Sequence, residues 1–154
     1  MIELNEEVKK LLKDKSSIKI LATIDEKGYP HVVIKDSMTV LETGEIAYAE
    51  DLDSSISNKN MVRSIWFDKP VSINVSKGNE SYQIKGRPKK CIITGPLFKE
   101  FLLRERERTN NKADIQSVWI ISAEELRNQN RELRRDEEWK KRPYFNIHLD
   151  RLKK

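Results

Sequence analysis

Residues 18–34 read IKILATIDEKGYPHVVI, and this stretch decides the fold class. Two runs rich in β-branched side chains, 18–24 and 31–34, flank the turn sequence Asp25-Glu26-Lys27-Gly28. Glycine at the end of such a turn can adopt the positive φ that a short hairpin needs. The stretch therefore predicts a β-hairpin near the start of the chain.

Apolar or alternating segments of strand length recur along the rest of the sequence. Gly86 and Pro88 lie inside the longest of them, which predicts a bulge or bend at that point. About six strands at short spacing, interrupted by helices, indicate a mainly β (α+β) domain built as a small closed or partly closed barrel. These further segments are 46–49, taken as the third strand, 71–75, 82–93 and 115–121, while 38–41 is apolar sequence that leads from the second strand into the turn before 46–49.

Helical periodicity appears in three places before the last strand. Residues 2–13 place their leucines and Val8 on one stripe, which predicts an amphipathic helix. Residues 55–67 carry apolar side chains at helical spacing after the candidate caps Asp53 and Ser54. A third helix is expected after Gly95-Pro96. The apolar members of the second helix are Ile56, Met61, Val62, Ile65 and Trp66, and we expect Trp66 and Trp119 to be core residues.

The composition excludes several classes of protein. The chain has 154 residues and a net charge of +5, and no apolar run approaches the ~20 residues of a membrane span. No basic, apolar leader opens the sequence, so we expect a cytoplasmic protein with no membrane association. Cys91 is the single cysteine, expected as a small buried hydrophobe, and with two histidines it predicts no metal site.

The end of the sequence differs from the rest. Residues 124–154 hold ten basic and seven acidic side chains, and residues 124–142 look helical but almost wholly polar. We therefore divide the chain into a barrel domain over 1–126 and a basic C-terminal helical extension over 127–154. The extension is expected to lie across a partner subunit. A nucleic-acid-binding role is less favoured, because the acids dilute the basic surface that tracking a phosphate backbone requires.

Several short strings, in their order, resemble the pyridoxamine-phosphate-oxidase-like FMN-binding split barrel family. The resemblance implies a six-stranded antiparallel split β-barrel with flanking helices, a homodimer, and one FMN at each end of the subunit interface. Both subunits contribute to each site in that family. The strings are LATIDEKGYPHVV (21–33), SISNKN (55–60), PVSINV (70–75), YQIKG (82–86) and ISAE (121–124).

The resemblance also suggests cofactor-binding residues. Ser57, Asn58, Lys59 and Asn60 open a helix and offer the cation, hydroxyl and amides that a flavin phosphate needs, with Lys35 as a second cation. The flavin ring is expected against the strand backbone at His31, Val32, Val33 and Ile34 and at Tyr48 and Ala49, with Gln83 reaching the cofactor. The plain alternatives are a solvated Lys59, an outward-facing Gln83 and a His31 that only pairs across the sheet.

The leading function is therefore that of an FMN-binding flavoprotein, an oxidoreductase or an electron carrier. No catalytic acid, base or nucleophile can be assigned. True pyridoxamine phosphate oxidases end in Arg-Leu-x-Pro, whereas this chain ends Arg151-Leu152-Lys153-Lys154, so pyridoxine phosphates are not expected as substrates. The alternative is a barrel that binds haem or a deazaflavin, with His31 or His148 as the candidate haem ligand.

Overall fold

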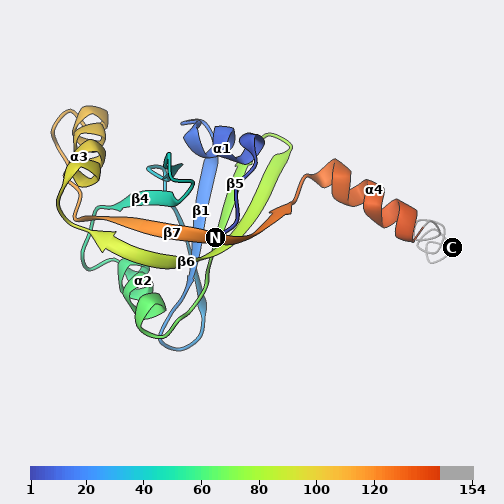
Figure 1. Cartoon of the computed structure of the whole chain (residues 1–154), viewed down its shortest axis with the longest axis horizontal. Helices are drawn as coiled ribbons and strands as arrows, with labels where there is room; N and C mark the ends of the chain where they lie inside the picture. The colour runs from blue at the N-terminus through green and yellow to red at the C-terminus, as the bar shows by residue number, and fades with distance from the viewer. Residues whose placement is uncertain (143–154) are drawn as a thin grey trace, which may run out of the picture.

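The computed structural model describes residues 1–142, which fold around one strongly curled antiparallel sheet of seven strands (Figure 1). The strand order is β2-β1-β5-β6-β7-β4-β3, so β2 and β3 form the two edges. The elements are α1 (Glu6–Lys13), β1 (Ile18–Ile24), β2 (Pro30–Ile34), β3 (Thr39–Val40), β4 (Ile46–Glu50), α2 (Ile56–Trp66), β5 (Val71–Lys77), β6 (Glu80–Ile92), α3 (Pro96–Arg108), β7 (Ser117–Asn128) and α4 (Arg131–Lys141).

The β-hairpin predicted near the start of the chain is confirmed. Strands β1 and β2 pair with Thr23 opposite His31, and Gly28 in the turn between them has a φ of 85°. The strand count of six is wrong, because Thr39–Val40 forms a separate short strand on β4. A turn after β2 sends the chain to the opposite edge of the sheet, where this seventh strand can pair.

Strands β6 and β7 form the longest ladder and carry the predicted irregularity. Their register shifts between Lys85 and Gly86 and again between Pro88 and Lys90. A Cβ atom on Gly86 would overlap the carbonyl oxygen of Ser122, so the close approach of the two strands requires glycine here. Strand β7 continues to Asn128, opposite Tyr82, and the helix predicted over 124–142 therefore begins only at Arg131.

The core fills the inside of the curl. Helices α1 and α2 lie at opposite ends of the curled sheet (Figure 1), and Leu12 of α1 and Met61 of α2 belong to one buried cluster with Tyr48 and Trp119. A second cluster around Phe101 packs α3 against β7 and β4. The predicted burial of Trp119 is confirmed, with 1% of its surface exposed.

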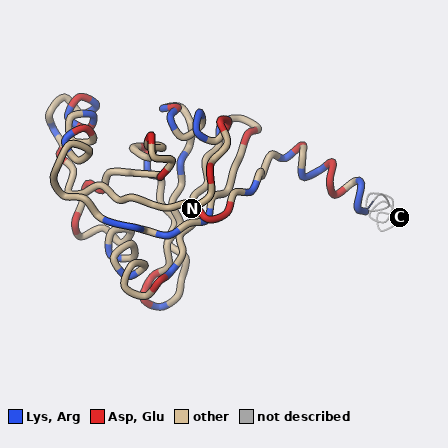
Figure 2. The backbone as a smooth tube through the Cα atoms, viewed as in Figure 1, with Lys and Arg blue, Asp and Glu red and all other residues tan. Residues whose placement is uncertain are grey.

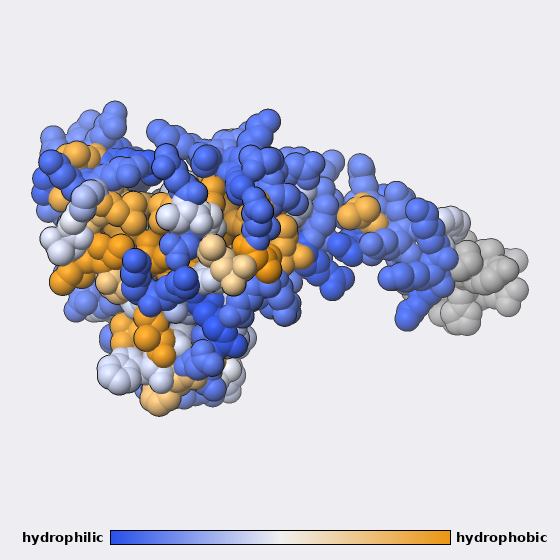
Figure 3. Space-filling model, in the orientation of Figure 1, coloured by the Kyte–Doolittle hydropathy of each residue, from blue (hydrophilic) through white to orange (hydrophobic). Residues whose placement is uncertain are grey.

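Helix α2 buries a mostly polar face, whereas its apolar periodicity predicts that the apolar face is buried. Its buried side chains are Ser57, Asn60, Met61 and Ser64, whereas Trp66 is 78% exposed. The expectation that Trp66 is a core residue is therefore wrong, and apolar side chains are visible on the surface over α2 (Figure 3). Polar anchors on the sheet, described below, determine this orientation. The exposed apolar residues of α2 and its C-terminal end are Ile56, Val62, Ile65, Trp66 and Phe67, here called the α2 apolar surface.

Two further expectations concern Cys91 and the extension. Cys91 is exposed rather than buried, because it lies beyond the second register shift of β6. Helix α4 projects away from the body beyond the end of β7 and carries both signs of charge along its length (Figures 1 and 2). No helix within residues 1–142 is long and apolar enough to cross a membrane.

Candidate cofactor site

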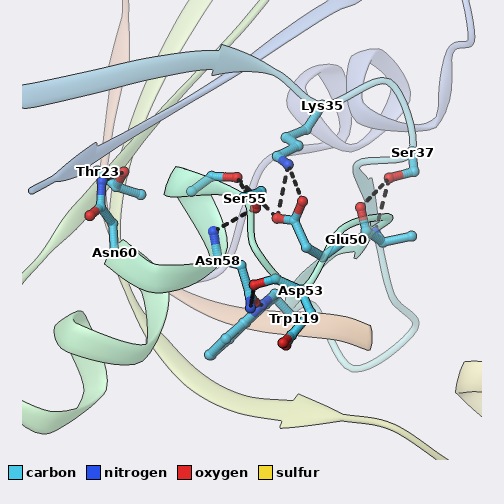
Figure 4. Close-up of polar contacts among 11 residues, drawn as sticks. Thr23, Lys35, Ser37, Glu50, Asp53, Ser55, Asn58, Asn60 and Trp119 are labelled. Carbon is cyan, nitrogen blue, oxygen red and sulfur yellow. Dashed lines mark hydrogen bonds and ion pairs between the residues drawn. The ribbon is translucent and has the colours of Figure 1, made fainter. Parts of the chain in front are cut away.

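Polar side chains from three elements meet where β2 and β4 end and α2 begins (Figure 4). Lys35 directly follows β2, Glu50 is the last residue of β4, and Ser57 lies in the first turn of α2. The turn is fixed locally, because the Ser55 hydroxyl accepts a hydrogen bond from the Asn58 backbone N–H at 3.0 Å. The sequence suggested Asp53 or Ser54 as the cap, and the structure assigns that role to Ser55.

Glu50 is the centre of this cluster. The ammonium of Lys35 lies 2.9 Å from both carboxylate oxygens of Glu50, and the Ser57 hydroxyl donates to Oε2 at 3.0 Å. The Glu50 side chain is 3% exposed and that of Lys35 is 11% exposed. A charge this well buried persists only when it is paired and hydrogen-bonded, as Glu50 is. Lys35 also lies 5.2 Å from the centre of the Tyr48 ring.

Two asparagines hold α2 on the sheet. Asn58 donates to the carbonyl oxygen of Asp53 and accepts from the indole N–H of Trp119, both at 2.9 Å. Asn60 donates to the Thr23 hydroxyl at 3.0 Å, and the side chains of Asn60 and Thr23 are both buried. The side chains of Asn58 and Asn60, expected at a phosphate, therefore anchor the helix in this structure. Lys59 is exposed and has no hydrogen bond or ion pair through its side chain within the described residues.

The electrostatics around this cluster are dominated by carboxylates. Burial raises the pKa of Asp51, and the neighbouring Glu105 and Glu50 raise it further. Glu105 itself is buried and pairs with Arg108 at 2.6 Å. Burial, with a smaller contribution from Glu50, also raises the pKa of the Tyr48 phenol, whose oxygen has no hydrogen-bond partner within residues 1–142.

The residues expected to contact the flavin ring fall into two groups. Tyr48 and Ala49 are buried beside the Glu50 cluster, and the Ala49 N–H donates to the Ser37 hydroxyl at 2.9 Å. Along β2, His31 and Val33 are half-buried, whereas Val32 and Ile34 are 62% and 58% exposed. Gln83 lies on β6, opposite Asn74 of β5, and two strands separate it from β2.

Sequence reasoning missed Glu50, Ser37 and Thr23. The one available signal for Glu50 was a carboxylate at the end of an otherwise apolar strand, and nothing in the periodicity linked it to Lys35. No group of three or more metal-binding side chains occurs within residues 1–142. His148 and the terminal Arg151–Lys154 lie outside the described residues.

No family model matches the sequence, and no curated protein is significantly similar to it. Solved structures are similar in fold. HupZ of Group A Streptococcus is 20% identical, with a TM-score of 0.66 over 83% of this chain and 95% of that protein. A candidate pyridoxamine 5'-phosphate oxidase from Lactobacillus delbrueckii is 23% identical, with a TM-score of 0.62 over 81% and 93%.

An FMN-binding protein from Syntrophomonas wolfei is 11% identical, with a TM-score of 0.64 over 80% of this chain and 84% of that protein. An F420 reductase and HutZ, the haem storage protein of Vibrio cholerae, also match, with TM-scores of 0.60 and 0.56. The structural neighbours thus carry names that refer to FMN, F420 or haem. The chain has the fold of the pyridoxamine 5'-phosphate oxidase-like FMN-binding split barrels.

Proposed function

We propose that this protein is a homodimeric split barrel that binds FMN at the subunit interface and acts as an oxidoreductase or an electron carrier. The observation that carries the proposal is the set of donors around Glu50. Lys35 and the hydroxyl of Ser57, which lies in the first turn of α2, already hold one anion, the Glu50 carboxylate. These donors favour a negative charge at this end of α2, and the exposed Lys59 is a cation that Glu50 does not engage and that can meet the flavin phosphate.

The strand edges support binding of the flavin ring. Within residues 1–142, strand β2 pairs on one side only, with β1, so its other side offers backbone N–H and C=O groups without strand partners there. The pyrimidine edge of a flavin needs such donors and acceptors. Bound FMN would supply the transfer of hydride or single electrons, while the residues of the chain bind and orient it.

The exposed apolar residues support the dimer. The residues of the α2 apolar surface are exposed to solvent in the monomer. The side chains of Val32 and Ile34 on β2 are exposed as well. Exposed apolar residues gathered on one element often mark interaction sites. A second copy of the chain is the occupant we propose, because the resemblance of the sequence to the split-barrel family implies a site shared between two subunits.

The test is an absorption spectrum of the purified protein, recorded before and after incubation with FMN and removal of the excess. Flavin bands at about one FMN per subunit, together with a dimer in sedimentation, support the proposal. A protein that stays colourless and does not quench FMN fluorescence contradicts it.

A haem-binding function is the second candidate. The specific observation in its favour is that Glu50 fills the anion position, so a ligand without a phosphate at that position displaces nothing. His31 is half-buried on β2 and is the candidate ligand within the described residues. Titration with haem distinguishes the two, because a Soret band that His31→Ala removes identifies the haem site.

A further inference from the structure

The groups expected to bind a cofactor phosphate are directed at a carboxylate of the chain itself. Glu50 accepts from Lys35 through both oxygens and from Ser57 through Oε2. Its carboxylate thus lies at the first turn of α2, the end of the helix that favours negative charge. The sequence places no acidic residue in this first turn, so Glu50 provides the anion from a different element.

Glu50 is also held firmly at its backbone. It pairs with Ser117 of β7, and its carbonyl oxygen accepts from the Gln116 N–H at 2.7 Å. The main chain therefore cannot withdraw the carboxylate, and only rotation of a side chain that is 3% exposed can move it. A phosphate that approaches Lys35 and Ser57 must break three hydrogen bonds of Glu50 or remain beside its negative charge.

Displacing Glu50 and binding beside it would both weaken the binding of a phosphate. A phosphate monoester carries about two negative charges near pH 7, and like charges at close range repel strongly where water is excluded. A phosphate bound instead at the exposed Lys59 gains only a solvated ion pair, which contributes little to affinity. The phosphate of FMN therefore adds little to binding at this site.

We infer that Glu50 acts as an internal competitor for the phosphate position, so that the site binds flavins with little preference for the phosphorylated form. This inference rests on the proposed flavin-binding function and specifies it. Glu50 is the residue that determines this specificity.

The experiment compares the dissociation constants of FMN and riboflavin for the wild type and for Glu50→Gln. Glutamine keeps the length of the side chain and an oxygen acceptor for Ser57 and Lys35, but it removes the charge. We expect the wild type to bind the two flavins within about threefold of each other. Loss of the charged competitor should raise FMN affinity about tenfold or more and leave riboflavin affinity nearly unchanged.

The control is Glu45→Gln, which makes the same change of charge at a carboxylate that is 17% exposed and paired with Lys89. It should change neither affinity. The inference is overturned if the wild type prefers FMN by more than about thirtyfold, a result that needs no variant. It is also overturned if Glu50→Gln raises FMN affinity no more than Glu45→Gln does.

Inorganic phosphate separates a failure of this inference from a failure of the proposed function. At matched ionic strength, phosphate should raise the unfolding midpoint of Glu50→Gln relative to chloride, and should do so less for the wild type. If neither the wild type nor Glu50→Gln binds FMN or riboflavin, the flavin proposal fails, and the phosphate measurement alone decides the role of Glu50. In that case, equal shifts of the unfolding midpoint by phosphate in the two proteins overturn the inference about Glu50.

Discussion

The indole N–H of Trp119 donates a hydrogen bond of 2.9 Å to the side-chain oxygen of Asn58, which joins β7 to the first turn of α2. Trp119 is 1% exposed, so this bond lies at the boundary of the core. Asn58 uses its amide nitrogen on the Asp53 carbonyl at the same time. The direction in which α2 begins, and with it the approach of Ser57 to Glu50, therefore depends on a residue 61 positions away.

Replacing Trp119 with phenylalanine should destabilise the protein by about 2 kcal/mol, because the Asn58 oxygen loses its donor and the smaller ring leaves space in the core. Urea unfolding measures the change. Trp66→Phe is the matched control at a side chain that is 78% exposed, and it should cost less than about 0.5 kcal/mol. Equal costs at the two positions would contradict the assignment.

Gly86→Ala should be the most damaging of the glycine substitutions, at about 3 kcal/mol, because the new Cβ overlaps the backbone oxygen of Ser122. The comparison is Gly28→Ala in the first hairpin, where space is open and only the positive φ opposes a side chain. That change should cost about 1 kcal/mol. Thermal unfolding of both variants checks that Gly86→Ala is the more destabilising of the two. The opposite result is expected if β6 and β7 can separate freely.

Asp14 should make stability depend on pH at the acid end. A hydrogen bond from Lys77, assisted by Ser16, holds the pKa of Asp14 well below its usual range. A carboxyl whose pKa is lower in the folded state contributes stability above its unfolded pKa and loses it as the pH falls through the folded value. Asp14→Asn should therefore lower the unfolding midpoint at pH 7, and the difference from wild type should shrink below about pH 4. Lys77→Met should show the same convergence, whereas a difference that stays constant with pH would rule out this origin.

A charge on the α2 apolar surface should dissociate the proposed dimer. Ile65 is 42% exposed, so Ile65→Glu should leave the fold intact while it introduces a charge that the interface must desolvate. Sedimentation at several concentrations should show a dissociation constant raised at least about tenfold. Leu103→Glu on α3, at a residue 52% exposed, makes the same kind of change elsewhere and should leave the assembly unaltered.

Deleting residues 131–154 should leave the stability of the barrel nearly unchanged, within about 1 kcal/mol, since α4 projects from the body (Figure 1). Asn130 must be retained, because its side-chain oxygen accepts from the Ser81 N–H at 2.7 Å. If the extension lies across a partner subunit, the same deletion weakens dimerisation or flavin retention. A truncated protein with an unchanged dimer and full flavin binding would show that the extension has no such role.

Much of the fold could be predicted from neighbouring residues. The turn at Gly28 and the irregularity at Gly86 and Pro88 depend on local backbone constraints, which a sequence states directly. The edge strand Thr39–Val40 was not resolved as a separate strand, because two residues form a strand only when a partner such as β4 is already in place. The start of α4 was misplaced for a similar reason, since pairing with β6 keeps residues up to Asn128 extended.

The sequence by itself determined the first hairpin, the mainly β class and the residue types gathered at the start of α2, because turn chemistry and periodicity act over a few neighbouring residues. Only the tertiary structure decided which face of α2 is buried, and it chose Ser57 and Asn60 over the apolar Ile65 and Trp66. It also placed Glu50 among the groups expected to bind a phosphate. These outcomes depend on hydrogen bonds and ion pairs between elements far apart in the chain, which leave no periodic pattern in the sequence.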